Sequence, residues 1–126
     1  MSASYTIDVG VYAVAFDPKG KYLAGAGIDD AVYVWDVDSQ ETVFVLGGHH
    51  QKIHTVAFTP DGSYLLSGGD DSTIRVWDVL SGRSLVAREF DSPIQSLAFS
   101  PDGKYLFCGN GNTTCYEIEF KKLLED

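Results

Sequence analysis

Short apolar segments recur along the chain at a nearly constant spacing. Residues 14–16 and 56–58 have the sequence Val-Ala-Phe, and residues 97–99 have the sequence Leu-Ala-Phe. The first residues of these segments lie 42 and then 41 positions apart (14 to 56, 56 to 97), and a fixed period of this length indicates repeated structural units. The apolar residues form short β-branched and aromatic runs without the spacing of a helix, which predicts an all-β fold.

Each repeat has the same order of strands and turns. The apolar segment is followed by a turn that contains proline and glycine, at residues 17–20, 59–62 and 100–103. A second strand is expected at residues 22–26, 64–68 and 105–109, and a third strand ends at Trp35, Trp77 and Ile118. Strands joined by short turns in this way predict an antiparallel meander.

Two sequence signatures connect these repeats to a known family. Trp35-Asp36 and Trp77-Asp78 end the third strands, and Gly48-His49 lies shortly before the second Val-Ala-Phe segment. With the spacing near 42 residues, the chain resembles WD40 repeats, which implies four-stranded antiparallel blades arranged around a channel. The expectation is a single domain, residues 1–126, with repeats at 4–36, 41–78 and 83–120. Residues 121–126 are expected to be a charged tail or a short helical turn.

The resemblance also implies a buried chain of hydrogen bonds in the second repeat, formed by His49, Ser67, Asp71 and Trp77. The first repeat keeps Asp29 and Trp35 but has Ile7 and Gly25 at the other two positions; the third has Phe90, Cys108, Asn112 and Ile118. His49, Ser67 and Asp71 are also the residue types of a hydrolase triad. A serine that points between two sheets cannot serve as a nucleophile, so a structural role is expected and the protein is not expected to be an enzyme.

The number of outer strands predicts self-association. In the family the outermost strand of a blade precedes the next repeat, which assigns residues 42–46 and 84–90 to the first and second blades. The third blade has no equivalent, whereas residues 4–8 form a spare outer strand: Ser4, Tyr5, Thr6, Ile7 and Asp8. Since propellers have about four to eight blades, we expect two copies to close a six-bladed ring as a homodimer by exchanging this strand. A hetero-complex with another chain's blades and a fragment of a longer propeller are the alternatives.

Partner binding is expected on one rim of the propeller. In WD40 proteins the residues beside the start of each inner strand and before the turn aspartate contact peptides or proteins. The matching positions here are Tyr12, Ile28, Lys52, His54, Asp70, Pro93 and Gln95. The predicted function is a scaffold for protein–protein interaction, with a basic segment as the expected ligand. The alternative is a structural subunit that supplies three blades to another chain's propeller and has no ligand of its own.

Composition limits the other classes of partner. The formal net charge of −9 has the wrong sign for binding nucleic acid or an anionic membrane directly. No apolar run approaches the roughly 18 residues of a spanning helix, and an intracellular location, cytoplasm or nucleus, is expected. Cys108 and Cys115 are expected to stay reduced there, although a disulfide across their hairpin is the alternative.

No cofactor and no metal are expected. The three histidines, His49, His50 and His54, lie on a strand and a loop, without a cysteine to complete a tetrahedral site. The glycines at residues 25–27 and 109–111 have no downstream lysine or helix, so they are expected to serve in turns, not in a phosphate loop.

Overall fold

The computed structural model describes residues 11–27, 30–110 and 115–125, without the side chains of residues 11, 12, 27, 110, 115 and 116. The predicted strand 4–8 and rim residue Ile28 lie outside this part, as does the side chain of Tyr12. In the described part eleven strands are followed by one short helix. The all-β prediction is confirmed.

The strands form three antiparallel sheets in chain order, here called the first, second and third blades. The first contains β1 (Val11–Phe16), β2 (Tyr22–Gly27), β3 (Ala31–Asp36) and β4 (Thr42–Gly47). The second contains β5 (Ile53–Phe58), β6 (Tyr64–Gly69), β7 (Thr73–Asp78) and β8 (Ser84–Glu89). The third contains β9 (Ile94–Phe99), β10 (Tyr105–Asn110) and β11 (Cys115–Glu119).

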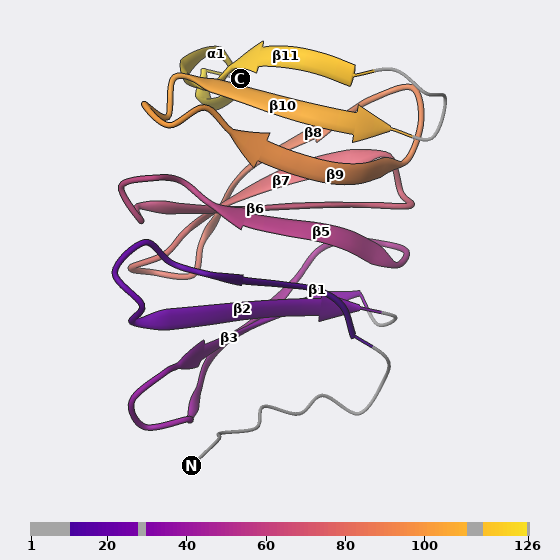
Figure 1. Cartoon of the computed structure of the whole chain (residues 1–126). Coiled ribbons are helices and arrows are strands. Elements are labelled where there is room, and N and C mark those ends of the chain that lie inside the picture. The colour runs from indigo at the N-terminus through magenta and orange to yellow at the C-terminus, as the bar shows by residue number, and fades with distance from the viewer. Residues whose placement is uncertain (1–10, 28–29, 111–114, 126) are drawn as a thin grey trace.

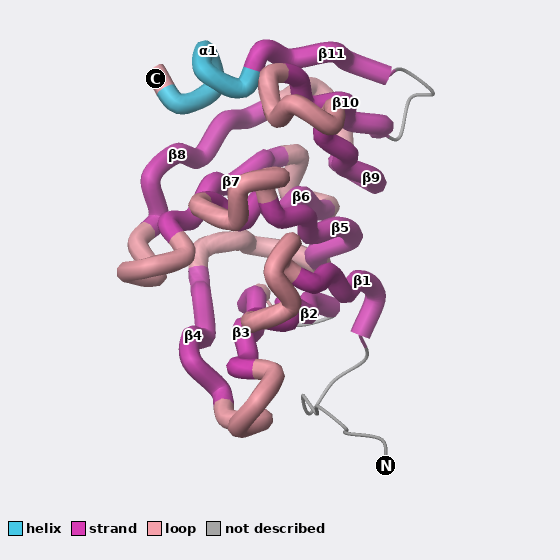
Figure 2. Tube along the Cα trace, turned by 60° about the vertical axis from the view of Figure 1, so that its left-hand side comes forward, coloured by secondary structure: helices cyan, strands magenta, loops and turns pink. Residues whose placement is uncertain are grey.

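The blades are stacked face to face in an open arc (Figure 1). The first strands of the blades, β1, β5 and β9, follow one another along one side, and β4 and β8 lie along the opposite side (Figure 2). Every strand runs antiparallel to its neighbour in the sheet, so the turns of all blades lie along two opposite edges of the stack. The ring is not closed within the described residues.

Two apolar layers hold the stack together. Alternate residues of a strand face opposite sides of the sheet, and Ala24, Val32 and Val34 of the first blade pack against Phe58, Leu65 and Trp77 of the second. On the other side of the second blade, Leu66, Ile74 and Val76 join Ile94, Leu106 and Cys108 of the third. Cys108 is fully buried.

The third blade has three strands in the described residues, one fewer than the four that the sequence predicts. After β11 the chain forms α1 (Phe120–Leu124), which is the helical alternative for this segment. The segment is not a fully solvated charged tail, because Phe120 and Leu123 are buried against the second blade. The ring of Phe120 meets the rings of Tyr64 and Phe99 edge-on, at centroid distances of 5.6 and 5.3 Å.

The outward face of the first blade exposes residues that are buried inside the stack. Val14 is 63% exposed, whereas Val56, its counterpart in the second blade, is 7% exposed. Phe16 is 62% exposed and its counterpart Phe58 is 9% exposed. The same side chains are therefore packed where a neighbouring blade follows and solvated where none does. No helix in the described residues has the length and apolarity required to cross a membrane.

Candidate functional site

A tight turn between β6 and β7 positions the polar residues of the second blade. A Cβ atom at Gly69 would overlap the carbonyl oxygen of Lys52, so only glycine lets the two segments approach this closely. The backbone N–H of Asp70 donates to that carbonyl at 2.8 Å, and Ser72 adopts a φ of 66° to complete the turn. The turn thereby places Asp70 and Asp71 beside the loop that precedes β5.

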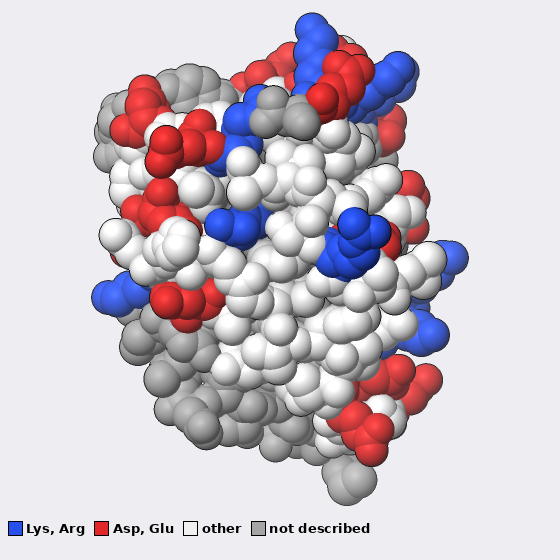
Figure 3. All heavy atoms as spheres, turned by 180° about the vertical axis from the view of Figure 1, so that it is seen from behind, with Lys and Arg blue, Asp and Glu red and all other residues white. Residues whose placement is uncertain are grey.

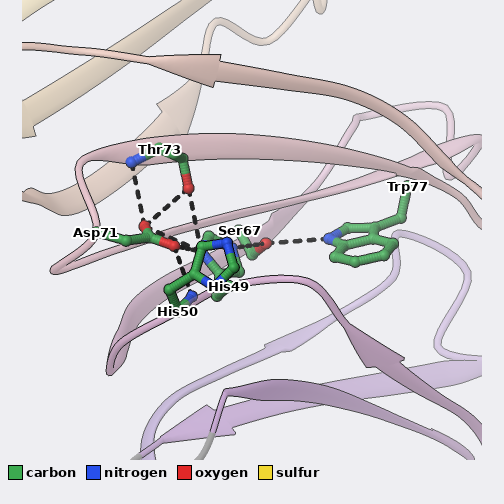
Figure 4. Close-up of polar contacts among 6 residues, drawn as sticks. All are labelled: His49, His50, Ser67, Asp71, Thr73 and Trp77. Carbon is green, nitrogen blue, oxygen red and sulfur yellow. Dashed lines mark hydrogen bonds and ion pairs between the residues drawn. The ribbon is translucent and has the colours of Figure 1, made fainter.

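Four side chains of this blade form one continuous chain of hydrogen bonds (Figure 4). Trp77 Nε1 donates to Ser67 Oγ at 3.0 Å, and Ser67 Oγ lies 2.7 Å from His49 Nε2. His49 Nδ1 lies 2.9 Å from an Asp71 carboxylate oxygen. The structure therefore brings together the four residues that the sequence singled out for this role.

Two further groups hold Asp71, and the sequence analysis did not identify them. Thr73 Oγ1 donates to Asp71 Oδ1 at 2.7 Å, and the backbone N–H of Thr73 donates to the same atom at 3.1 Å. The backbone N–H of His50 donates to Asp71 Oδ2 at 3.0 Å. An aspartate two residues before a threonine in a turn favours such bonds, so the Asp71-Ser72-Thr73 segment contained a signal for Thr73.

Electrostatics favour a neutral histidine beside an ionised aspartate. Burial lowers the pKa of His49 below 6.5 and outweighs the opposing attraction of Asp71. Burial alone would raise the pKa of Asp71, but the hydrogen bonds from His50 and Thr73 and the charge interaction with His49 lower it overall. With Asp71 ionised, His49 Nδ1 carries the proton, and Nε2 accepts the hydroxyl proton of Ser67.

The geometry does not support catalysis by Ser67. Its side chain is 0% exposed, and its oxygen is already shared between the indole N–H of Trp77 and the ring of His49. A nucleophile requires access to a substrate and an oxyanion site. Within the described residues, no group of three or more His, Cys, Asp or Glu side chains is placed to hold a metal ion.

The first blade fills the place of the serine with an aromatic ring. Gly25 occupies the position of Ser67, and a Cβ atom there would lie 2.8 Å from Trp35 Cζ3. The Trp35 ring thus packs directly against the backbone of β2, where Trp77 instead reaches a hydroxyl group. In the third blade the corresponding residue, Cys108, is buried in an apolar cluster.

The rim residues that the structure describes in the second and third blades lie along the edge of the stack where β5 and β9 begin. His54 Nε2 and Asp70 Oδ1 are 2.6 Å apart, and their side chains are 26% and 35% exposed. Lys52 and Gln95 are exposed, and Pro93 is half-buried. The described rim residues therefore present a histidine–carboxylate pair flanked by polar side chains.

The reverse side of the molecule has a different character (Figure 3). Acidic side chains gather along its two lateral edges, and its middle is largely uncharged apart from a few Lys and Arg side chains. Exposed apolar residues of the outer strands include Val43 and Val45 in β4 and Leu85 in β8. This side therefore carries no continuous basic surface over the residues that the structure describes.

The repeated blades are similar to those of a known protein family. The sequence matches the WD40 family, described as "WD domain, G-beta repeat", over residues 4–36, 40–78 and 83–116. The chain belongs to the WD40 repeat family. A curated relative is the general transcriptional corepressor TUP1 of Saccharomyces cerevisiae, 35% identical over 54 residues, which are 43% of this chain and 8% of TUP1.

A solved structure supports the WD40 fold. The β-propeller domain of Cps50 (Swd1) from Myceliophteria thermophila superposes with a TM-score of 0.79 and 23% identity. The match covers 86% of this chain and 35% of the Cps50 chain, so the three blades correspond to part of that propeller. WD40 propeller proteins are generally non-enzymatic scaffolds that bind other proteins.

Proposed function

We propose that this chain is a non-enzymatic scaffold that binds partner proteins or peptides at the rim formed by Lys52, His54, Asp70, Pro93 and Gln95, together with Tyr12 and Ile28. The observation that carries the proposal is the partly exposed His54–Asp70 pair. His54 lies at the start of β5, and Asp70 lies in the turn that the Asp71 network fixes. Side chains on loops held by a rigid scaffold are the usual anchors of binding sites.

Charge favours a basic segment as the ligand. The Asp70 carboxylate is partly open to solvent, Asp71 is directly adjacent to it, and the chain has an excess of acidic over basic residues. A lysine or arginine side chain of a partner would approach a field of the opposite sign, which accelerates encounter and orients the ligand.

A displayed peptide library tests this proposal. Peptides rich in Lys and Arg should be enriched on the wild-type chain and lost on a variant that combines Lys52→Ala, His54→Ala and Asp70→Asn. The matched control combines Lys19→Ala and Asp38→Asn, two substitutions in exposed turns along the opposite edge of the stack. This control variant should keep the binding. Equal enrichment on the rim variant and the wild type would contradict the rim as the binding surface.

We further propose that residues 1–126 act as one domain and that a second copy closes a six-bladed ring. The exposed Val14 and Phe16 support this, because their counterparts in the second blade are covered by a neighbouring blade. Residues 4–8 of one copy would pair with the free edge of β11 in the other. Blades from a different chain, or from a longer form of this one, are the competing sources.

A purely structural role is the second candidate, and the same exposed face favours it. In that case the three blades complete another propeller and the rim has no ligand. Alanine at Tyr12, Lys52 and His54 would then leave assembly intact, whereas deletion of residues 4–8 would abolish it.

We also propose that the protein lies inside the cell, in the cytoplasm or nucleus. The similarity to a transcriptional corepressor supports this location, and cell fractionation of the tagged chain tests it.

A further inference from the structure

Glu117 occupies a packing position of the third blade that is apolar in the other two. In the first blade Val34 pairs with Ala24 across β3 and β2, and in the second Val76 pairs with Leu66. In the third blade Glu117 pairs with Phe107 at the same place in the sheet. Cross-strand partners point to the same side of a sheet, so these three pairs face the same direction along the stack.

Inside the stack this direction leads into a neighbouring blade. Val34 and Val76 are buried, as are their partners Ala24 and Leu66. On the third blade no neighbour follows within the described residues, and Phe107 is 37% exposed beside the exposed Glu117. A blade added here in the manner of the other two would cover both side chains.

The surface that a second copy offers for this purpose is apolar. The outward face of its first blade carries Val14 and Phe16 on β1, with Leu23 and Trp35 packed together behind them. The cross-strand pairs Phe16–Leu23 and Leu23–Trp35 place these residues on one side of the sheet. None of these side chains can form an ion pair with a carboxylate.

We propose that Glu117 makes self-association depend on pH, an inference that rests on the proposed ring closure. Closure would place the carboxyl group of Glu117 against the apolar face of the first blade of the other copy. A carboxylate without a partner is costly to bury, whereas the protonated acid is far less so. Each interface would take up one proton from solvent, and a closed ring of two copies would take up two.

The other titratable groups near Glu117 do not supply a cation that would pair with its carboxylate in place of the proton. On β11 Glu119 points the same way and pairs with Lys122 of α1 at 4.0 Å. β10 contributes Tyr105, and β9 contributes the uncharged Ser96 and Ala98. The covering face contributes Tyr33, whereas Asp36 points to the other side of β3 from Trp35. Lys21, just before β2, interacts with Asp36 and with the ring of Tyr22. Within the part of the chain that the structure describes, β9, β10 and the four strands of the first blade contain no Lys, Arg or His.

Sedimentation velocity over a range of concentrations tests the inference at about pH 7.5 and about pH 6. The dimer of the wild type should tighten by up to about tenfold per interface for each unit of falling pH. Glu117→Gln and Glu117→Val should both tighten the dimer at the higher pH and remove the dependence. Glu119→Gln, a charge removal on the same strand, is the matched control and should behave like the wild type.

The outcomes separate this inference from the proposal on which it rests. If the wild type and both Glu117 variants stay monomeric at every concentration, closure by a second copy is wrong. If all of them form equally strong dimers with no effect of pH, self-association stands and the role of Glu117 is refuted. If only Glu117→Val associates, and does so without a defined stoichiometry, added surface apolarity explains the result and the inference also fails.

Discussion

At the scale of single residues, the chain of hydrogen bonds explains why one blade holds polar groups in its interior. Ser67, His49 and Trp77 are almost completely inaccessible, and every polar atom that links them has a partner. Buried polar groups cost free energy when they lose such partners. Removal of one polar group from this network should therefore lower the stability of the second blade. The first blade has Gly25 in place of Ser67 and is not subject to this loss.

Substitution of Ser67 measures this sensitivity. Ser67→Ala leaves the indole N–H of Trp77 and Nε2 of His49 buried without their shared partner, and we expect the free energy of unfolding to fall by roughly 2–4 kcal/mol. The exposed Ser84→Ala should change it by less than about 0.5 kcal/mol. Urea unfolding followed by tryptophan fluorescence gives both values. Equal stabilities of the two variants would show that the network contributes nothing.

Stability should decrease in mild acid because of His49. Its folded pKa is below 6.5, so the unfolded chain binds the proton more readily and unfolding takes up a proton. The contribution of His49 is complete above about pH 6.5 and is lost as the pH falls toward the folded pKa. Asp71, whose folded pKa lies below 3.8, adds a loss of the same sign in stronger acid.

Urea unfolding at several pH values between about 8 and 5 tests this sign, and an NMR titration assigns the effect to the His49 ring. The exposed His50 provides a control, since His50→Gln should retain the decrease. A His49 ring that titrates above its ordinary range, or a chain that becomes more stable on mild acidification, would be incompatible with the neutral histidine described above.

At the scale of elements, the sequence predicted the strands more accurately than the contacts of the β6–β7 turn and of the C-terminal segment. Proline and glycine fix the turns at residues 17–20, 59–62 and 100–103, so the predicted second strands differ from β2, β6 and β10 by a single residue at the end. The bonds of Thr73 to Asp71 are local and could have been predicted from the Asp71-Ser72-Thr73 spacing, whereas the contact of Thr73 with His49 depends on the tertiary fold. The charges of residues 121–126 concealed that Leu123 is buried.

Truncation of Leu123 tests the role of α1. Its side chain packs into the apolar layer between the second and third blades, and its carbonyl oxygen accepts from Arg88 Nη2 at 3.5 Å. We expect Leu123→Ala to destabilise the chain by about 2–4 kcal/mol. Differential scanning calorimetry measures this effect. Leu80, which is 88% exposed, supplies the matched control, and Leu80→Ala should be nearly neutral. Similar melting temperatures for both would mean that α1 does not anchor the third blade.

At the scale of the whole molecule, the described residues form an open stack with two unlike ends. One end exposes Val14 and Phe16, and the other exposes Tyr105 and Phe107 beside Glu117. The sequence predicted the blades from their repeats, but it could not show how the two ends differ, because exposure depends on which neighbours are present. Closure by a second copy would cover both ends at once and leave the rim open for ligands.

Light scattering coupled to size exclusion, at concentrations spanning several orders of magnitude, tests ring closure by a second copy most directly. The chain has a mass of 13.7 kDa, and ring closure predicts a defined species of twice that mass that becomes dominant as the concentration rises. A folded species that keeps the mass of a single chain at every concentration would contradict ring closure by a second copy.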